Sequence, residues 1–321
     1  MILNQPQVSI KNILPLSQAS AFGKIIIVGE HAVVYGSSAV ALPINDLPIN
    51  IVCQTRPLDK KVSYNLNEQP AAVTVNKIIN EVFSKLDVNP VSLNININSN
   101  LPIGAGLGSS AALINSLIQA VAKLFLIPLN QKQLAFFTNQ IETIFHGTPS
   151  GLDSTVVSYN KPIFFHSKND YETFNIKDPV IGNKSYKWKF VLIDSEERCP
   201  TITMINEAKP YFTNPKKQRM RRIKFNYFAK KTYESLSQGN IFALGEIINE
   251  CQKMLEEANI VTNKQKDMIE TIQEIGTLGT KITGAGGGGC IFTILHPEKE
   301  EAQLKKLNKN FNKKNIFNIS I

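Results

Sequence analysis

The chain has 321 residues, of which 43% are hydrophobic and 19% charged, which excludes a disordered chain and is typical of about two globular domains. Its formal net charge of +9 permits nucleic acid, anionic membranes or nucleotides as partners and selects none of them. The four cysteines form no C-x-x-C pair, which argues against a zinc site or a disulfide framework and fits a reducing cytosol. There is neither a run of about 18 apolar residues nor a secretory leader, so we expect a cytoplasmic protein that does not span a membrane.

The first half of the chain predicts strands, then a glycine-rich turn and helices. Residues 25–28 are β-branched and predict a buried strand, and apolar residues alternate with asparagine over 93–98, as in a half-buried strand. The sequence LPIGAGLGSS follows directly, and the apolar stretch 111–125 after it predicts a buried helix. A further helix is predicted over 131–145, ended by Gly147.

The second half of the chain begins with a predicted strand over 187–194, after a polar and turn-rich stretch. We therefore place a domain boundary near residue 184 and expect two domains, 1–184 and 185–321. Helices and strands are mixed throughout, which indicates an α+β architecture. Helices are predicted over 221–236, 240–257 and 263–276, and strands over 281–283 and 290–295.

The turn at 101–112, LPIGAGLGSSAA, has the composition of an anion-binding loop. Alternate glycines let a backbone approach an anion and adopt positive φ, and the start of the following helix offers unpaired N–H groups to a phosphate. The spacing fits neither a Walker A motif nor a Rossmann fingerprint. A simple helix cap would need only one glycine and one serine, so the excess favours a phosphate site. The residues concerned are Gly104, Gly106, Gly108, Ser109 and Ser110.

A second glycine cluster, 284–289, matches G-x-G-x-x-G literally. It is followed by the predicted strand 290–295 and not by a helix, which argues against a dinucleotide site. The cluster predicts a turn between two strands, and its glycines would let another backbone pack closely or shape the phosphate pocket from the other domain.

Several titratable residues near the glycines fit phosphoryl transfer, which needs a divalent metal, positive charge at the transferred group and often a carboxylate for the acceptor hydroxyl. Lys24, Ser110, Glu142 and Asp153 would supply those parts together. Taken singly, each residue has an ordinary structural interpretation. Lys24 would be a solvated surface charge, Glu142 would lie on the polar face of a helix, and His31 would be a hydrogen-bonded structural residue. The combination favours the catalytic interpretation.

Three motifs resemble the GHMP kinase superfamily: GKIIIVGEHAVVYG (23–36), LPIGAGLGSSAA (101–112) and KITGAGGGGC (281–290), with HGTPSGLDSTV (146–156) as a fourth. The resemblance implies an N-terminal α/β domain like that of ribosomal protein S5 and a C-terminal ferredoxin-like α+β domain. It also implies phosphoryl transfer from ATP with Mg²⁺ to a small alcohol. Mevalonate is the expected acceptor, with phosphomevalonate, homoserine or a sugar as the alternatives.

The resemblance also implies residue roles. Asp153 would take or activate the proton of the acceptor hydroxyl, Lys24 would lie beside it, and Ser110 and Glu142 would bind Mg²⁺. The ATP phosphates would lie on Gly104, Ala105, Gly106, Leu107, Gly108, Ser109, Ser110 and Ala111. The substrate would contact Glu30, His31, Thr201 and Gly286.

Two other interpretations come from different functional classes. A catalytically inactive ligand sensor would be expected to have lost one of the four catalytic or metal-binding side chains, and all four are present. A nucleic-acid-binding protein would rest on the basic runs 216–224 and 305–315, but no nucleic-acid-binding module accompanies them, so we expect solvated faces. The sequence leaves a homodimer open.

Overall fold

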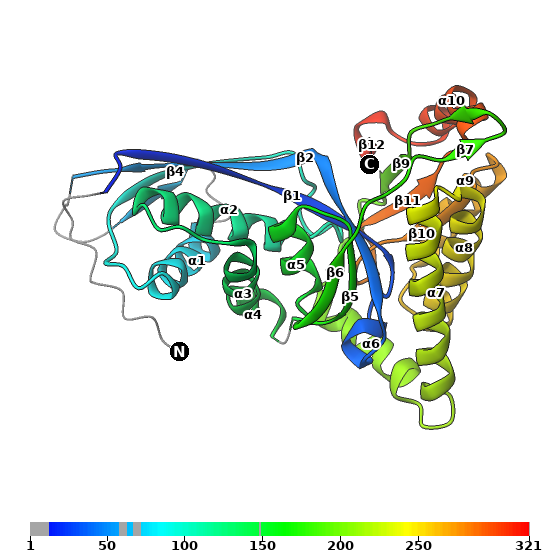
Figure 1. The fold of residues 1–321 in the computed structure, drawn as a ribbon, viewed down its shortest axis with the longest axis horizontal. Coiled ribbons are helices and arrows are strands. Elements are labelled where there is room, and N and C mark those ends of the chain that lie inside the picture. Colours follow the sequence, from blue (N-terminus) through cyan, green and yellow to red (C-terminus); the bar gives the residue numbers. More distant parts are fainter. Residues whose placement is uncertain (1–12, 58–62, 67–71, 148, 321) are drawn as a thin grey trace.

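The computed structural model describes residues 13–57, 63–66, 72–147 and 149–320. The predicted absence of a secretory leader concerns mainly residues 1–12, which lie outside the described residues. Two large sheets organise the chain, one built from residues 16–173 and the other from 189–320 (Figure 1). The described part of the chain contains no helix long and apolar enough to cross a membrane.

The first sheet has six strands in the order β3-β4-β2-β5-β6, with β1 paired antiparallel to β2. The predicted strands at 25–28 and 93–98 are confirmed, and Leu93, Ile95 and Ile97 are buried while the asparagines between them are not. The strands are β1 (Leu16–Val28), β2 (Ala39–Thr55), β3 (Tyr64–Leu66), β4 (Leu93–Ser99), β5 (Ile163–Ser167) and β6 (Asp170–Thr173).

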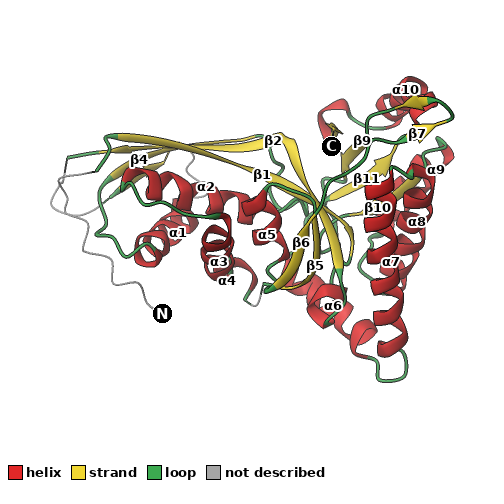
Figure 2. Cartoon of the chain, viewed as in Figure 1, coloured by secondary structure: helices red, strands yellow, loops and turns green. Residues whose placement is uncertain are grey.

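Five helices lie together along one side of this sheet (Figure 2). They are α1 (Ala72–Lys85), α2 (Ser109–Leu124), α3 (Gln131–Ile141), α4 (Thr143–His146) and α5 (Leu152–Tyr159). The central helix α2 is apolar on nearly every side, and most of its residues are buried, as predicted for 111–125. The prediction of one helix over 131–145 is wrong at one residue, because α3 ends and α4 begins on either side of Glu142.

The second sheet has four antiparallel strands in the order β10-β11-β9-β12. Its strands are β9 (Lys189–Asp194), β10 (Gly279–Ile282), β11 (Cys290–Ile294) and β12 (Ile316–Ser320). Its helices are α6 (Thr201–Thr213), α7 (Gln218–Gln238), α8 (Ile241–Glu257), α9 (Asn263–Glu274) and α10 (Glu300–Asn310). The predicted helices correspond to α7, α8 and α9, and the predicted glycine turn joins β10 to β11.

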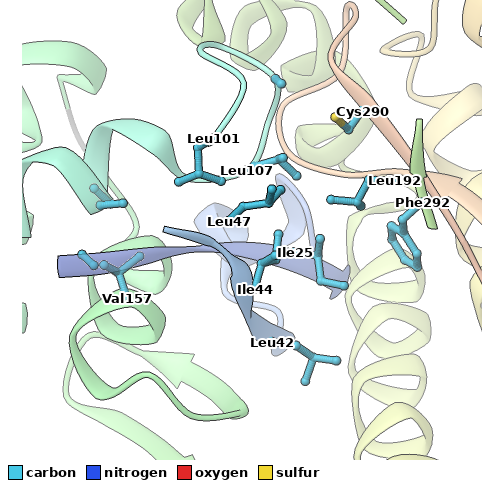
Figure 3. Packing of buried hydrophobic residues seen from close by; sticks show 14 of the residues in the cluster. Ile25, Leu42, Ile44, Leu47, Leu101, Leu107, Val157, Leu192, Cys290 and Phe292 are labelled. Atoms are coloured by element: carbon cyan, nitrogen blue, oxygen red, sulfur yellow. The ribbon is translucent and has the colours of Figure 1, made fainter. Parts of the chain in front are cut away.

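The region of the predicted domain boundary holds a short hairpin, β7 (Val180–Ile181) with β8 (Lys184–Ser185). The boundary itself stays a prediction. The hydrophobic core does not stop there: Ile25 and Leu107 from the first half belong to the same buried cluster as Leu192 and Cys290 from the second (Figure 3). A continuous core holds the two sheets against each other and fixes the cleft between them.

Candidate active site

A cleft of about 330 Å³ lies where the two halves meet. It brings together residues from strand β1, the short 3-10 helix η2 (Ala32–Tyr35), the turn before α2, the α3–α4 junction, the start of α5 and the second glycine turn. Among the predicted site residues, those that line it are Lys24, Glu30, His31, Gly104, Gly106, Gly108, Ser109, Ser110, Glu142, Asp153, Thr201 and Gly286. The side chains of Ala105, Leu107 and Ala111 do not, because they are buried in the core beneath the turn.

The turn between β4 and α2, which we call the phosphate loop (residues 100–108), opens the first turn of α2 onto the cleft. Gly104, Gly106 and Gly108 have φ values of 66°, 80° and 72°, a conformation that side chains with a Cβ rarely adopt. Gly108 directly precedes α2, and Ser109 and Ser110 of its first turn line the cleft, so the positive end of the helix dipole lies at the cleft. This geometry suits a phosphate group.

The second glycine turn (residues 283–289) packs directly on the phosphate loop, backbone against backbone. A Cβ on Gly284 would lie 2.6 Å from the Cα of Gly106, and a Cβ on Gly289 would lie 2.7 Å from the carbonyl oxygen of Ala105. The N–H of Cys290 donates to that same oxygen at 2.9 Å. The predicted close backbone packing is confirmed, and no helix follows this turn to make a dinucleotide site.

Lys24 and Asp153 form an ion pair beside the phosphate loop, with Nζ and Oδ2 3.3 Å apart. The side chain of Lys24 is 2% exposed and that of Asp153 30%, so the lysine is sequestered while the carboxylate reaches the cleft. The ammonium also donates to the carbonyl oxygen of Gly106 at 3.0 Å. Asp153 lies in the first turn of α5, where the helix dipole favours a negative charge. Thr148 of the same motif lies outside the described residues.

Glu142 is a buried carboxylate whose Oε2 has no hydrogen-bond partner. Burial first, and the neighbouring Asp153 second, raise its pKa well above the ordinary value, against the opposing charges of Lys24 and Lys168. An unpartnered buried oxygen beside a second carboxylate and the first turn of α2 fits a hard divalent cation. The described residues contain no cluster of three or more His, Cys, Asp or Glu, so such a cation would complete its shell with hydroxyl, phosphate and water oxygens.

Glu30 and Lys281 form an ion pair in the wall of the cleft, and neither side chain is exposed. Next to them, His31 makes a 2.8 Å hydrogen bond from Nε2 to the carbonyl oxygen of Ala285. Since a carbonyl oxygen only accepts, Nε2 carries the proton; burial lowers the pKa of His31, so the ring is neutral and Nδ1 is an acceptor.

Sequence reasoning missed two cations of the site. Lys281 is the one charged residue of β10, and a lysine in so short and buried a strand was a usable signal. Arg198 gave no such signal, because only the fold brings it to the phosphate loop. Its guanidinium binds both oxygens of Asp194 at 2.6 and 2.7 Å, and Nε donates to the carbonyl oxygen of Ile103 at 2.9 Å. Thr201, the first residue of α6, lines the cleft, and its predicted contact with the substrate stays a prediction.

Two family models match the chain, GHMP kinases N terminal domain over residues 73–161 and GHMP kinases C terminal over residues 232–313. A mevalonate kinase of Pyrococcus furiosus is 30% identical over 311 residues, a match that covers 88% of this chain and 90% of that relative. The chain belongs to the GHMP kinase family. A mevalonate kinase of Methanocaldococcus jannaschii is 29% identical over 313 residues, covering 89% of this GHMP kinase and 94% of the relative.

The fold of this GHMP kinase is shared by a solved structure, that of L. major mevalonate kinase in complex with R-mevalonate. The two structures superpose with a TM-score of 0.83 at 19% identity, over 98% of both chains, which shows a common fold. The predicted family, its two-domain fold and the phosphotransferase class are confirmed. As a kinase of this family, the protein uses ATP as the phosphoryl donor.

Proposed function

We propose that this GHMP kinase phosphorylates mevalonate. The γ-phosphoryl group of ATP would pass to the primary hydroxyl of mevalonate and give 5-phosphomevalonate and ADP. The observation that carries the choice of acceptor is the similarity to two proteins named mevalonate kinase over at least 88% of this chain. The fold supports the reaction class alone, since one fold can hold sites for different acceptors.

The phosphate loop and the first turn of α2 would hold the ATP phosphates. Gly104, Gly106 and Gly108 bring the backbone against the cleft, and Ser109 and Ser110 begin the helix there. Ala105, Leu107 and Ala111 would contribute backbone N–H groups only, because their side chains anchor the loop in the core. These fixed N–H groups stabilise phosphate charge without reorganising during the reaction.

Asp153 would accept the proton of the mevalonate hydroxyl as its oxygen bonds to the γ-phosphorus and the bond to the ADP oxygen breaks. Lys24, 3.3 Å from that carboxylate, would stabilise the negative charge shared by the hydroxyl oxygen and the transferring group. In phosphoryl transfer, positioning and electrostatic stabilisation supply most of the catalysis. A buried lysine held by both a carboxylate and the loop carbonyl of Gly106 meets that need.

Ser110 and Glu142 would hold a magnesium ion next to the phosphates. When bound, Mg²⁺ neutralises charge on the phosphate oxygens of ATP. The buried Oε2 of Glu142, which has no hydrogen-bond partner, supports this assignment, because a bound cation would both occupy that oxygen and favour the ionised form of a carboxylate whose pKa is otherwise raised.

Four residues would contact the acceptor: Glu30 and His31 between β1 and η2, Thr201 at the start of α6, and Gly286 in the second glycine turn. Glu30 and neutral His31 offer hydrogen-bond acceptors to hydroxyl groups, and Thr201 offers a hydroxyl that both donates and accepts. A polar wall of this kind suits a small hydroxylated molecule.

The test is ADP release by the purified protein with ATP, Mg²⁺ and one of four acceptors: mevalonate, phosphomevalonate, homoserine or galactose. We expect turnover with mevalonate at a kcat/KM at least about a hundredfold above the others. Preferential turnover of another acceptor would keep the kinase and replace the substrate. Absence of turnover with all four, while ATP still binds, would contradict the proposed function.

A further inference from the structure

The buried pair of Lys281 and Glu30 joins the two halves of the molecule at the cleft. Glu30 follows β1 of the first sheet, and Lys281 lies in β10 of the second. Besides the carboxylate Oε1 of Glu30, the ammonium of Lys281 donates to the carbonyl oxygens of Ile282 at 2.7 Å and of Ile26 at 3.3 Å. It also lies 5.1 Å from the centre of the Phe292 ring. Every proton of the ammonium therefore has an acceptor within the protein.

The carboxylate of Glu30 is only half satisfied. Oε1 is bound by Lys281, whereas Oε2 is buried and has no hydrogen-bond partner. Glu30 nevertheless lines the cleft. A buried ion pair is costly to form, and a charged oxygen left without a donor adds to that cost. A hydroxyl group arriving in the cleft would supply the missing donor.

We propose that Lys281 is a positioning residue, which holds the Glu30 carboxylate ionised and in place so that Oε2 accepts a hydrogen bond from a hydroxyl of the acceptor substrate. The inference rests on the proposed function in that the substrate is a small alcohol. Lys281 itself need not touch the substrate: its three protons are used by Glu30, Ile282 and Ile26.

The charges around Glu30 indicate what the lysine does. Burial raises the pKa of Glu30. The charge and hydrogen bond of Lys281 are the main influences against this rise, followed by the backbone N–H of Glu30 itself and then by the charge of Lys24. The other titratable groups nearby are His31, whose lowered pKa keeps it neutral, and Cys251 of α8, whose pKa burial raises to about 12. Neither changes charge near neutral pH. Without the lysine, Glu30 would therefore take up a proton and offer a hydroxyl where the substrate needs an acceptor.

The experiment compares wild type, Lys281→Met, Glu30→Gln and the double variant. For Lys281→Met we expect the KM for mevalonate to rise about tenfold at neutral pH while the KM for ATP stays within about twofold. In this variant the KM for mevalonate should fall as the pH rises, because Glu30, whose pKa is raised further without the lysine, regains its charge. The wild type and the double variant should lack this pH dependence.

Two controls separate positioning from general damage. Lys187→Met removes the lysine of an exposed pair with Asp178 and should change none of these constants. If Lys281→Met alone fails to fold, the double variant keeps the comparison with Glu30→Gln, since it replaces the buried charges by two neutral side chains. The double variant should then match Glu30→Gln in its KM for mevalonate, and a further tenfold rise would overturn the proposal.

An infrared difference spectrum supplies a readout that does not depend on turnover. The spectrum of Lys281→Met minus that of wild type should show an added band of a protonated carboxyl group, and the spectrum of the double variant minus that of Glu30→Gln should not. Any contribution from Glu142, whose pKa is also raised, is common to all four proteins and cancels. If the wild type fails to phosphorylate mevalonate, the proposed function fails while this spectrum still tests Lys281. An ionised Glu30 in Lys281→Met, or equal effects on the KM values of ATP and mevalonate, would overturn the role of Lys281.

Discussion

At the scale of single residues, the cleft is built from charged side chains that the fold has taken out of water. Lys24, Glu30, Glu142 and Lys281 are each at most 2% exposed. Burying a charge is costly unless a partner or ligand compensates it. Lys24 and Lys281 each have a carboxylate partner, whereas one oxygen of Glu30 and one of Glu142 have none. Under the proposed function, the substrate would provide a partner for the oxygen of Glu30, and a metal ion would bind that of Glu142.

Asp153→Asn tests the proposed base. The amide keeps the size of the side chain but cannot accept the hydroxyl proton, so we expect kcat to fall by about 10²–10⁴. The dissociation constant of ATP, measured by calorimetry, should change by less than about threefold, because the phosphate loop is intact. Asp178→Asn, at an exposed carboxylate that does not line the cleft, should leave kcat unchanged. Near-normal turnover by Asp153→Asn would remove this residue from the chemistry.

Glu142→Gln tests the proposed metal ligand. An amide oxygen binds Mg²⁺ less well than a carboxylate, so the Mg²⁺ concentration for half-maximal activity should rise at least about tenfold. Steady-state rates measured across a magnesium titration decide this. An unchanged magnesium dependence would contradict the assignment.

The same variant should affect stability in a way that depends on pH. Burial and Asp153 raise the pKa of Glu142 in the folded protein above its ordinary value of 4.5. The unfolded chain therefore loses this proton at a lower pH than the folded protein does, and the free energy of unfolding falls as the pH rises from 4.5 toward the raised pKa. The melting temperature of metal-free Glu142→Gln, measured by circular dichroism, should therefore exceed that of wild type by a margin that grows from acid to neutral pH.

At the scale of elements, the two glycine turns form one unit, because each fills the space that a side chain of the other would need. Gly106 has a φ of 80° and lies against Thr283 and Gly284, whereas Gly36 has the same φ with nothing near its Cβ position. The two residues therefore separate the cost of backbone strain from the cost of losing the contact between the turns.

Gly106→Ala should lower the free energy of unfolding by about 2–4 kcal/mol, and Gly36→Ala by about 1 kcal/mol, since only the first adds a backbone clash to the strain. Urea unfolding measures both values. Gly106→Ala should also weaken ATP binding by at least about tenfold, because the loop that we propose to bind the phosphates must shift. Equal losses of stability in the two variants would show that the packed turns contribute nothing beyond local strain.

At the scale of the whole molecule, function depends on contacts between segments far apart in the chain. Arg198, which follows β9 of the second sheet, is bound by Asp194 and holds the carbonyl oxygen of Ile103 in the phosphate loop. Although burial acts to raise it, the hydrogen bonds from Arg198 and the N–H of Glu196 keep the pKa of Asp194 below its ordinary value, so the carboxylate stays charged. The second half of the molecule thereby braces the loop of the first.

Arg198→Ala should raise the KM for ATP about tenfold with a smaller change in kcat, because the loop loses its brace and the proposed catalytic pair of Lys24 and Asp153 is untouched. The KM for mevalonate should stay within about twofold. Steady-state kinetics with each substrate varied in turn measures the three constants. Arg219→Ala, at an exposed arginine of α7, is the control, and an Arg198 variant indistinguishable from it would contradict the bracing role.

The basic runs 216–224 and 305–315 do not belong to the cleft. Their lysines are exposed on α7 and the turn before it, and on α10 and the residues after it. This agrees with the predicted solvated faces, and the excess positive charge of the chain is carried in part by these two surfaces.

By itself, the sequence determined those strands, helices and turns that depend only on residues close together in the chain. The strand at 93–98, the buried helix α2 and both glycine turns follow from residue periodicity and from the freedom of glycine to adopt positive φ, so local sequence predicted them. The motifs also identified most of the residues that line the cleft, because each motif is a short segment that can be found from the sequence alone. The break at Glu142 was missed because nothing in the apolar pattern of 131–145 marks it.

Only the tertiary structure decided which charges meet. Lys24 and Asp153 are 129 positions apart by residue number, and Glu30 and Lys281 are 251 apart. The first pair depends on how α5 packs against β1 and the second on how the two sheets pack, and no local pattern carries that information. The same holds for the unpartnered oxygens of Glu30 and Glu142, because the absence of a donor is a property of the surrounding fold. The chemistry that a side chain can perform is a local property. Its burial and its partners, which set its charge and reactivity, arise from contacts across the whole chain.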